Sequence, residues 1–254
     1  MTKKYELLKD DYIIVDNKSL YRIRLLKLLN RLPKGTLGGY IEGEHNLSHE
    51  STCWIYDDAM IMGNAHVKDS AKIQFNALVK DNAEISGNAT VSGYARISDN
   101  AKVTDKAKVS GEAQISGNAE ISGKAFIIGK VKVKDNATVT DKAKLTNKVI
   151  ISENAVIQGN AEISGNAKVK GNSTIDGDAV ISDDVSILNC RIINGNSYIY
   201  GDVLIDGQAA ISGNTTINGH AQILGKTILS DHSLLSNRLI TGKTIIKDSK
   251  IMRE

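Results

Sequence analysis

The segment Ala95–Asn118 has the sequence ARISDN-AKVTDK-AKVSGE-AQISGN, which is four six-residue units with one shared pattern. Each unit starts with Ala, places Ile or Val two positions later, and continues with Gly or Asp two positions after that. The step of six runs without a slip from Ile55 to Leu235, through 31 positions that are all Ile, Val or Leu. A repeat of this length decides the fold before any other feature of the chain.

The local structure follows from the spacing within one unit. The small residue and the aliphatic residue lie two positions apart, so in an extended strand both side chains face the same side. The residues beside them are mostly Ser, Thr, Lys and Glu, which are expected to face solvent. The Gly or Asp and the following residue, often Asn, turn the chain, because Gly and Asn reach left-handed backbone angles cheaply. Each unit therefore predicts one short strand and one corner, and a period of six excludes a helix.

Strands of this length are stable only when they stack, with one rung per turn and about 4.8 Å between rungs. Three units that close a triangular coil of 18 residues satisfy this requirement, and the whole repeat then forms about ten coils. Such a coil has a narrow interior with one aliphatic and one small residue per side. The composition agrees, since the chain has 41% hydrophobic residues but only 4% aromatic residues and a single proline.

The repeat resembles the hexapeptide repeat of left-handed parallel β-helices. In that family an aliphatic residue is followed four positions later by a small one, as in Ile115-Ser-Gly-Asn-Ala119. The resemblance implies an all-β fold, a left-handed parallel β-helix. The left hand comes from the resemblance, because the general preference for right-handed crossovers would not predict it.

A second resemblance concerns the segment before the regular repeat. The stretches Gly35-Thr-Leu-Gly-Gly-Tyr-Ile-Glu42, Asn46-Leu-Ser48 and Cys53-Trp-Ile-Tyr-Asp-Asp-Ala59 resemble the first segment of YdcK-like proteins. Those are β-helical hexapeptide proteins of bacteria that are also common in phages, with no settled biochemical activity. The resemblance implies a bacterial or phage origin.

The two ends of the chain do not follow the repeat. Tyr12–Val15 and Leu20–Leu26 predict strands joined by a turn at Asp16-Asn17, although the second segment could also begin a short helix. Together they would form a small N-terminal β cap over the open end of the first coil. Trp54, Tyr56, Met60 and Met62 are expected to contact this cap. Three parts are predicted: a cap and lead-in segment 1–54, a β-helix 55–236, and an irregular final coil and C-terminal cap 237–254.

Many hexapeptide proteins are acyltransferases that use coenzyme A and a catalytic histidine between the subunits of a trimer. By this resemblance His66 and His220 are the candidate catalytic residues. His66 faces outward beside Glu84, which could orient it as a general base, whereas His220 occupies a corner. Solvated surface or corner histidines are nevertheless the favoured interpretation of both positions, so no catalytic residue is expected, and His45 and His49 are expected to be solvated loop residues.

Outward residues 18 positions apart should stack into columns. One face collects a basic stripe whose strand positions carry no acid until Asp206, and which could attract nucleic acid or another anionic partner. No aromatic residues interleave with it for base stacking, so nucleic acid is not the favoured partner. The stripe comprises Lys80, Arg96, Lys132, Lys134, Lys168 and Lys170.

Outward apolar residues concentrate in the C-terminal half of the chain. One column there, Val156-Thr174-Ile192-Ala210-Ile228 in 18-residue steps, has no charge, and exposed apolar columns are typical of interfaces. Since hexapeptide proteins usually pack as trimers, a homotrimer is expected. The predicted interface residues are Phe126, Ile128, Val156, Val180, Ile192, Tyr198, Tyr200 and Ile228.

The cysteines, the histidines, the apolar runs and the net charge bear on which classes of function are possible. Cys53 takes a small inward position and Cys190 a corner, and neither these two cysteines nor the histidines have metal-site spacing, so no metal or cofactor is expected. No apolar run is long enough to cross a membrane and no signal peptide opens the chain, which favours the cytoplasm. The net charge of +3 is too small to name a partner.

The sequence therefore favours a non-enzymatic, rigid β-helical scaffold for protein association, self-associating as a trimer and with a possible host protein partner. A phage origin would permit a role in blocking a host system. A coenzyme A-dependent acyltransferase with a site at the subunit interface is the first alternative. Binding of nucleic acid or another anionic partner through the basic stripe is the second.

Overall fold

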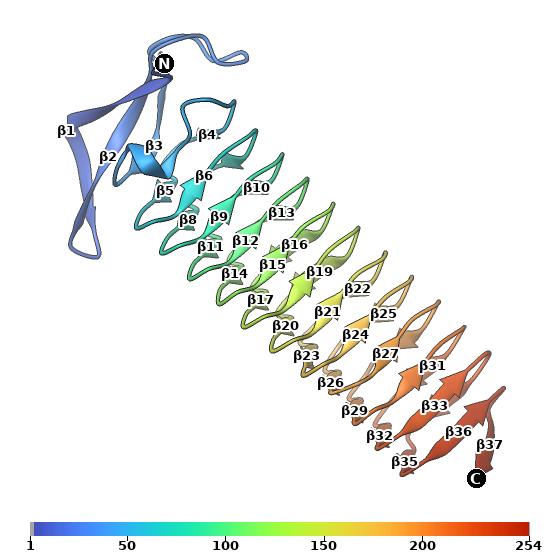
Figure 1. The fold of residues 1–254 in the computed structure, drawn as a ribbon. Coiled ribbons are helices and arrows are strands. Elements are labelled where there is room, and N and C mark those ends of the chain that lie inside the picture. The colour runs from blue at the N-terminus through green and yellow to red at the C-terminus, as the bar shows by residue number, and fades with distance from the viewer. Residues whose placement is uncertain (1–2, 254) are drawn as a thin grey trace. The chain divides into compact units, whose positions relative to one another are not determined.

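The computed structural model describes residues 3–253, which belong to two compact units, Met1–Lys124 and Ala125–Glu254. Both units are β-structures built mainly of strands two to four residues long (Figure 1). The described residues contain no helix long and apolar enough to cross a bilayer.

Unit 1 begins with an antiparallel hairpin made of β1 (Tyr5–Val15) and β2 (Lys18–Leu25). Asp16 and Asn17 connect the two strands with φ angles of 48° and 60°. Two consecutive left-handed residues form the type I′ turn that suits the twist of a hairpin, and Asp and Asn adopt this conformation readily. The turn and the two strands of the cap are thus confirmed.

The rest of unit 1 winds through three sheets of short parallel strands. The hairpin sheet has the order β1, β2, β3 (Leu37–Ile41), β5 (Met60–Ile61), β8 (Leu78–Val79), β11 (Arg96–Ile97) and β14 (Gln114–Ile115). The β4 sheet contains β4 (Trp54–Ile55), β7 (Lys72–Ile73), β10 (Thr90–Val91) and β13 (Lys108–Val109). The β6 sheet contains β6 (His66–Val67), β9 (Glu84–Ile85), β12 (Lys102–Val103) and β15 (Glu120–Ile121). A short 3₁₀ helix, η1 (Glu44–Asn46), lies before β4.

The cap joins the first turn through β3, which pairs with β2 on one side and with β5 on the other. Two glycines in β3 allow the close approach. A Cβ atom at Gly38 would lie 2.6 Å from the Ile55 carbonyl oxygen, and one at Gly39 would overlap the carbonyl oxygen of Ala59. Trp54 is fully buried at this junction, where its ring packs edge-on against Tyr5.

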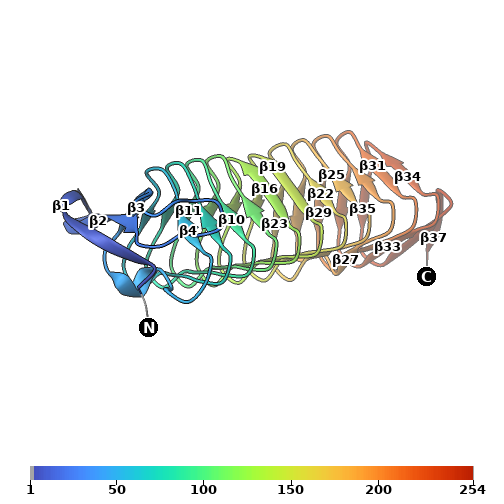
Figure 2. The same cartoon turned by 90° about the horizontal axis from the view of Figure 1, so that it is seen from above.

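Unit 2 repeats the same winding through three sheets, which are seen from a second direction in Figure 2. The β16 sheet contains β16 (Phe126–Gly129), β19 (Lys144–Asn147), β22 (Glu162–Ile163), β25 (Val180–Ile181), β28 (Tyr198–Ile199), β31 (Thr216–Asn218) and β34 (Leu234–Ser236). The β17 sheet contains β17 (Lys132–Val133), β20 (Ile150–Ile151), β23 (Lys168–Lys170), β26 (Ser186–Leu188), β29 (Leu204–Asp206), β32 (Gln222–Leu224) and β35 (Leu239–Thr241). The β18 sheet contains β18 (Thr138–Val139), β21 (Val156–Ile157), β24 (Thr174–Ile175), β27 (Ile192–Ile193), β30 (Ala210–Ile211), β33 (Thr227–Ser230), β36 (Thr244–Lys247) and β37 (Lys250–Arg253).

The predicted repeat is confirmed in both units. All 31 aliphatic positions from Ile55 to Leu235 are buried, and strands pair in register with residues 18 positions away. The chain is an all-β parallel β-solenoid of about 12 turns. The prediction of about ten regular coils is slightly short, because β3, β35 and β36, which lie outside the 31-step register, also join the parallel sheets.

The end of unit 2 shortens one step of the repeat to 17 residues. Ile240 pairs with Ile223, and Ile246 pairs with Leu229, so both still point inward although each comes one residue early in the sequence. The last strand, β37, then folds back antiparallel onto β36 and covers the edge of that strand. This hairpin forms the final irregular element that the sequence predicts.

The inward position two residues before Ile193 is filled differently from the prediction. The step of six assigns this position to Arg191 and places Cys190 at a corner. In the structure Cys190 is fully buried and Arg191 is exposed. The Cys190 amide is bonded to the Ser173 hydroxyl at 3.0 Å, and its Sγ lies 3.3 Å from the Ala209 carbonyl oxygen. A small sulfhydryl fits the bore, whereas a guanidinium would lose its hydration there.

Candidate functional site

A concave surface of unit 1 lies on the outside of the hairpin sheet, next to the cap. The hairpin covers the first strands of this sheet with a cluster in which Leu20, Tyr40 and Met62 are buried and Leu78 is partly buried. Beyond Leu78 the hairpin ends, and the outer residues of β8, β11 and β14 form a shallow hollow of about 210 Å³. The predicted contact of Met60 and Met62 with the cap is therefore confirmed.

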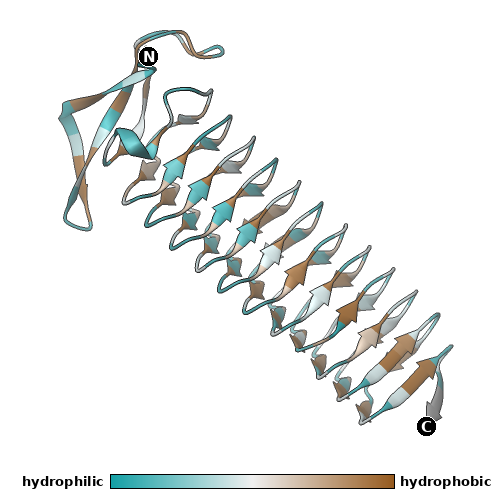
Figure 3. Ribbon diagram, in the orientation of Figure 1, coloured by the Kyte–Doolittle hydropathy of each residue, from teal (hydrophilic) through white to brown (hydrophobic). Residues whose placement is uncertain are grey.

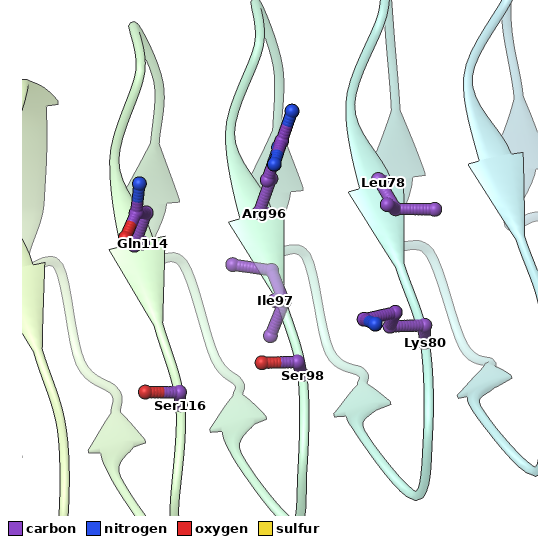
Figure 4. Close-up of a pocket in the computed structure, with 7 residues that line it drawn as sticks. All are labelled: Leu78, Lys80, Arg96, Ile97, Ser98, Gln114 and Ser116. Carbon is purple, nitrogen blue, oxygen red and sulfur yellow. The ribbon is translucent and has the colours of Figure 1, made fainter. Parts of the chain in front are cut away.

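Two rows of outward side chains and one inward residue line the hollow (Figure 4). They are Leu78, Arg96 and Gln114 in the first row, Lys80, Ser98 and Ser116 in the second, and Ile97 between them. The rows arise because residues 18 positions apart pair across parallel strands. The sequence places Lys80 and Arg96 in the basic stripe, and the structure adds the serines and Gln114.

The hollow offers hydrogen-bond donors and positive charge to a small anion. Lys80 is partly engaged, since its Nζ lies 3.8 Å from a carboxylate oxygen of Asp16 at the tip of the hairpin. Among residues 3–253 the Arg96 guanidinium has no hydrogen bond or ion pair, and in Figure 4 it extends away from Ser98 and Ser116. The cations do not converge, so this arrangement can attract an anion but holds no acid–base pair for catalysis.

His66 lies on β6 and pairs in register with Glu84 on β9, as predicted. The expected contact between their side chains is absent from the described part of the chain. The His66 Nδ1 lies 2.6 Å from the carbonyl oxygen of His45, and Glu84 instead forms an ion pair with Lys68 at 2.7 Å. A carbonyl oxygen only accepts, so Nδ1 carries the proton, and the backbone rather than Glu84 orients the ring.

His220 occupies a corner of unit 2, as predicted. Its Nδ1 lies 3.2 Å from a carboxylate oxygen of Asp202 on the preceding turn, and both side chains are largely exposed to solvent. An exposed pair of this kind contributes little energy, and it excludes no water from a reacting atom.

The expectation that both lead-in histidines are solvated is wrong for His49. Its ring stacks on Tyr5 with 4.2 Å between centroids, and its Nδ1 accepts a hydrogen bond from the backbone amide of Lys4 at 3.2 Å. Burial lowers the pKa of His49, because it disfavours the charged imidazolium. His45 remains exposed, with its Nε2 2.8 Å from the Gly63 carbonyl oxygen.

The other four residues of the basic stripe lie on the β17 sheet of unit 2. Lys132 and Lys134 lie on and just after β17, and Lys168 and Lys170 lie on β23, two rungs further along the sheet. Lys134 forms an ion pair with the corner residue Asp135 at 3.5 Å. Unit 2 therefore carries four of the six stripe residues on one surface, and Lys80 and Arg96 belong to unit 1.

The eight predicted interface residues all lie in unit 2, but on two different sheets. Val156, Ile192 and Ile228 share the outer surface of the β18 sheet. The β16 sheet carries the other five, and Val180 there pairs directly with Tyr198. Those five are Phe126, Ile128, Val180, Tyr198 and Tyr200.

Two exposed aromatic residues were not predicted as surface features. Phe75 and Tyr94 occupy corners on consecutive turns of unit 1, with 57% and 65% of their surfaces exposed. Phe75 has a φ of 59°, a conformation that the other corners mostly give to Gly, Asp or Asn. A sequence signal existed, since Phe75 stands where the repeat normally places Gly or Asp.

The comparison with protein-family models agrees with this architecture. A family model described as the YdcK beta solenoid repeat matches residues 83–96. Among solved structures, the UDP-N-acetylglucosamine acyltransferase from Campylobacter jejuni matches at 18% identity over 76% of this chain and 70% of that chain, with a TM-score of 0.23. The UDP-N-acetylglucosamine O-acyltransferase from Moraxella catarrhalis RH4 matches at 14% identity over 84% and 73%, with a TM-score of 0.26.

No curated protein matches the sequence. The TM-scores of the two acyltransferases are too low to support an inference about activity. The chain is thus a parallel β-solenoid that matches the YdcK beta solenoid repeat at residues 83–96, as the sequence predicts.

Proposed function

We propose that this protein is a non-enzymatic β-solenoid scaffold that associates with further copies of itself, as a trimer, through the outer surface of the β18 sheet. The observation that supports this proposal most directly is the uncharged column Val156, Thr174, Ile192, Ala210 and Ile228. In Figure 3 the ribbon of this sheet is coloured brown to white from β18 to β36, counting both the inward and the outward residue of each strand. Ile228 is 44% exposed, and Val156 and Ile192 are half-buried.

The second outward column of the same sheet is also nearly free of charge. It contains Gln158, Asn194, Ser212 and Ser230, with Asp176 as the exception. The Asp176 carboxylate accepts hydrogen bonds from Gln158 Nε2 at 3.0 Å and from the Gly177 amide at 2.6 Å. A partner that covers these two columns therefore buries a single carboxylate, and that carboxylate already accepts two hydrogen bonds within the chain.

The strands of this sheet also repeat in register along the axis, which suits self-association. Val156 and Ile228 are separated by four rungs, which corresponds to about 19 Å at the usual rung spacing. Identical solenoids can place such columns against one another without reshaping, because every rung repeats the same backbone. The backbone of these strands is already ordered by pairing on both sides, so little conformational entropy is lost when the surface becomes buried.

The first test changes the centre of this surface. Ile192→Glu places a charge on the column and is expected to convert trimers into monomers, which multi-angle light scattering measures as a threefold loss of mass. Ser186→Glu, which adds the same charge on the β17 sheet, serves as the control and should leave the trimer intact. A wild-type protein that is monomeric at all concentrations, or an Ile192→Glu variant that remains trimeric, would contradict the proposal.

Binding of an anionic partner is a second candidate function, supported by the four lysines on the β17 sheet. Replacing Lys132 and Lys168 by Glu should abolish salt-dependent retention on heparin, because phosphate or sulfate contacts release counterions in proportion to the cations involved. The control replaces the corner residues Lys142 and Lys148 by Glu, which changes the net charge equally. Equal retention of both double variants would remove this candidate.

A further inference from the structure

The start of unit 1 contains a lysine and a cysteine whose side chains meet in the interior. Lys4 precedes β1 and is fully buried, as is Cys53 just before β4. The Lys4 Nζ lies 3.3 Å from the Cys53 Sγ. The same nitrogen donates to the Cys53 carbonyl oxygen at 2.9 Å and to the Ser51 carbonyl oxygen at 3.1 Å.

These contacts hold both reactive groups in place. The Cys53 Sγ also lies 3.3 Å from the Ser51 hydroxyl and 3.5 Å from the Val67 carbonyl oxygen. Tyr5, the next residue after Lys4, donates its hydroxyl to the Leu47 carbonyl oxygen at 2.7 Å. The nitrogen and the sulfur are therefore within contact distance before any reaction, so little ordering remains for a bond between them.

The surroundings also favour the reactive form of the amine. Lysine is almost never fully buried unless its ammonium is paired, and here the neighbours are carbonyl oxygens and a thiol rather than a carboxylate. Burial lowers the pKa of Lys4, because a low-dielectric environment disfavours the charged ammonium. A larger share of the amine is then neutral and carries the lone pair needed for nucleophilic attack.

We propose that Lys4 and Cys53 form a reversible covalent cross-link when the protein meets hydrogen peroxide. The sulfur first attacks one peroxide oxygen, which gives a sulfenic acid and one water molecule. The Lys4 nitrogen then attacks the sulfur, so that an S–N bond forms and the S–O bond breaks. The departing hydroxide takes a proton from the nitrogen and leaves as the second water. Cysteine is oxidised by two electrons, and a thiol reductant restores both side chains.

The cross-link would strengthen the attachment of the cap to the first turn of unit 1. Positions 4 and 53 are separated by 49 residues, a stretch that includes the whole hairpin and β3. A bond between them therefore closes a long loop. Such a loop lowers the conformational entropy of the unfolded chain and thereby stabilises the folded state. Because Cys53 is fully covered, peroxide reaches the sulfur only during local opening of the segment, and the reaction should be slow.

The test treats the full-length protein with millimolar hydrogen peroxide and measures its mass and its peptides. The expected product has lost about 2 Da, contains a peptide with Lys4 joined to a peptide with Cys53, and reverts with dithiothreitol. Lys4→Arg, whose guanidinium is a poor nucleophile, and Cys53→Ser should both abolish this product. Cys53→Ser keeps the backbone carbonyl groups that accept from Lys4, so it tests the chemistry even if Lys4→Arg fails to fold.

Cys190 provides an internal control in the same chain. It is fully buried, and burial raises its pKa to about 12, which keeps the thiol protonated. Cys190→Ser should therefore form the cross-link at the wild-type rate. The proposal is overturned if peroxide leaves Cys53 unchanged, or if Cys53 only gains oxygen, in steps of about 16 Da, while Lys4 remains unlinked.

Discussion

Gly39→Ala is expected to loosen the cap from the first turn of unit 1 and to lower the free energy of unfolding by about 3 kcal/mol. The added Cβ would overlap the Ala59 carbonyl oxygen and lie 2.5 Å from the Ile55 Cγ2. Both neighbours belong to the first turn, and a backbone carbonyl in a parallel sheet cannot rotate away as a flexible side chain can. The strand β3 must therefore shift, which weakens its pairing with β5.

Urea unfolding followed by tryptophan fluorescence measures this effect, because the chain has a single tryptophan, Trp54, and it is buried at this junction. Gly35→Ala is the matched control. Gly35 has a φ of 93°, and a Cβ atom added there would meet no other atom within 4 Å, so alanine adds only backbone strain of about 1 kcal/mol. If the two variants unfold at the same urea concentration, the close approach at Gly39 does not hold the cap.

Ile163→Asp is expected to lower the free energy of unfolding of unit 2 by more than about 4 kcal/mol, which is enough to prevent cooperative folding. Ile163 is 1% exposed, and it faces the bore of the solenoid, where its neighbours are aliphatic or small. A carboxylate there would lose its hydration and find no cation in the described interior of unit 2. Protonation would reduce the cost but would leave an unpaired hydroxyl and a smaller side chain.

The preceding residue supplies the control within the same strand. Glu162 is exposed and forms an ion pair with Lys144 at 3.4 Å, so Glu162→Asp should change the stability by no more than about 0.5 kcal/mol. Circular dichroism during urea unfolding compares the two variants. An Ile163→Asp protein as stable as Glu162→Asp would mean that the two side chains do not face opposite sides of β22.

The repeat made the fold predictable because each of its units independently indicates the same strand, the same inward residue and the same corner. Every strand places one aliphatic residue inward at a step of six, so an error at one unit cannot change the register of the others. The hairpin turn was predictable for a different reason, since Asp16-Asn17 can adopt the left-handed angles that a tight hairpin requires.

The local departures could not be predicted from the same pattern. Cys190 replaces Arg191 inside the bore because burial of a guanidinium is costly, but the step of six alone does not weigh that cost. The His66 ring bonds the His45 carbonyl oxygen because the lead-in segment folds over β6, and that path lies outside the repeat. Lys4 was not predicted to be buried, since polar termini are normally solvated and its carbonyl partners come from a segment 49 residues away.

The regular rungs of unit 2 also create an ambiguity that a binding partner must resolve. Any ligand that recognises only backbone and corner groups could dock equally well after sliding by one rung, about 4.8 Å, along the axis. Residues that differ between rungs reduce this degeneracy, as bulky Ile192 and Ile228 alternate with the smaller Thr174 and Ala210 on one surface. In the self-association proposed above, this alternation distinguishes offsets of an odd number of rungs from offsets of an even number, which halves the number of equivalent alignments.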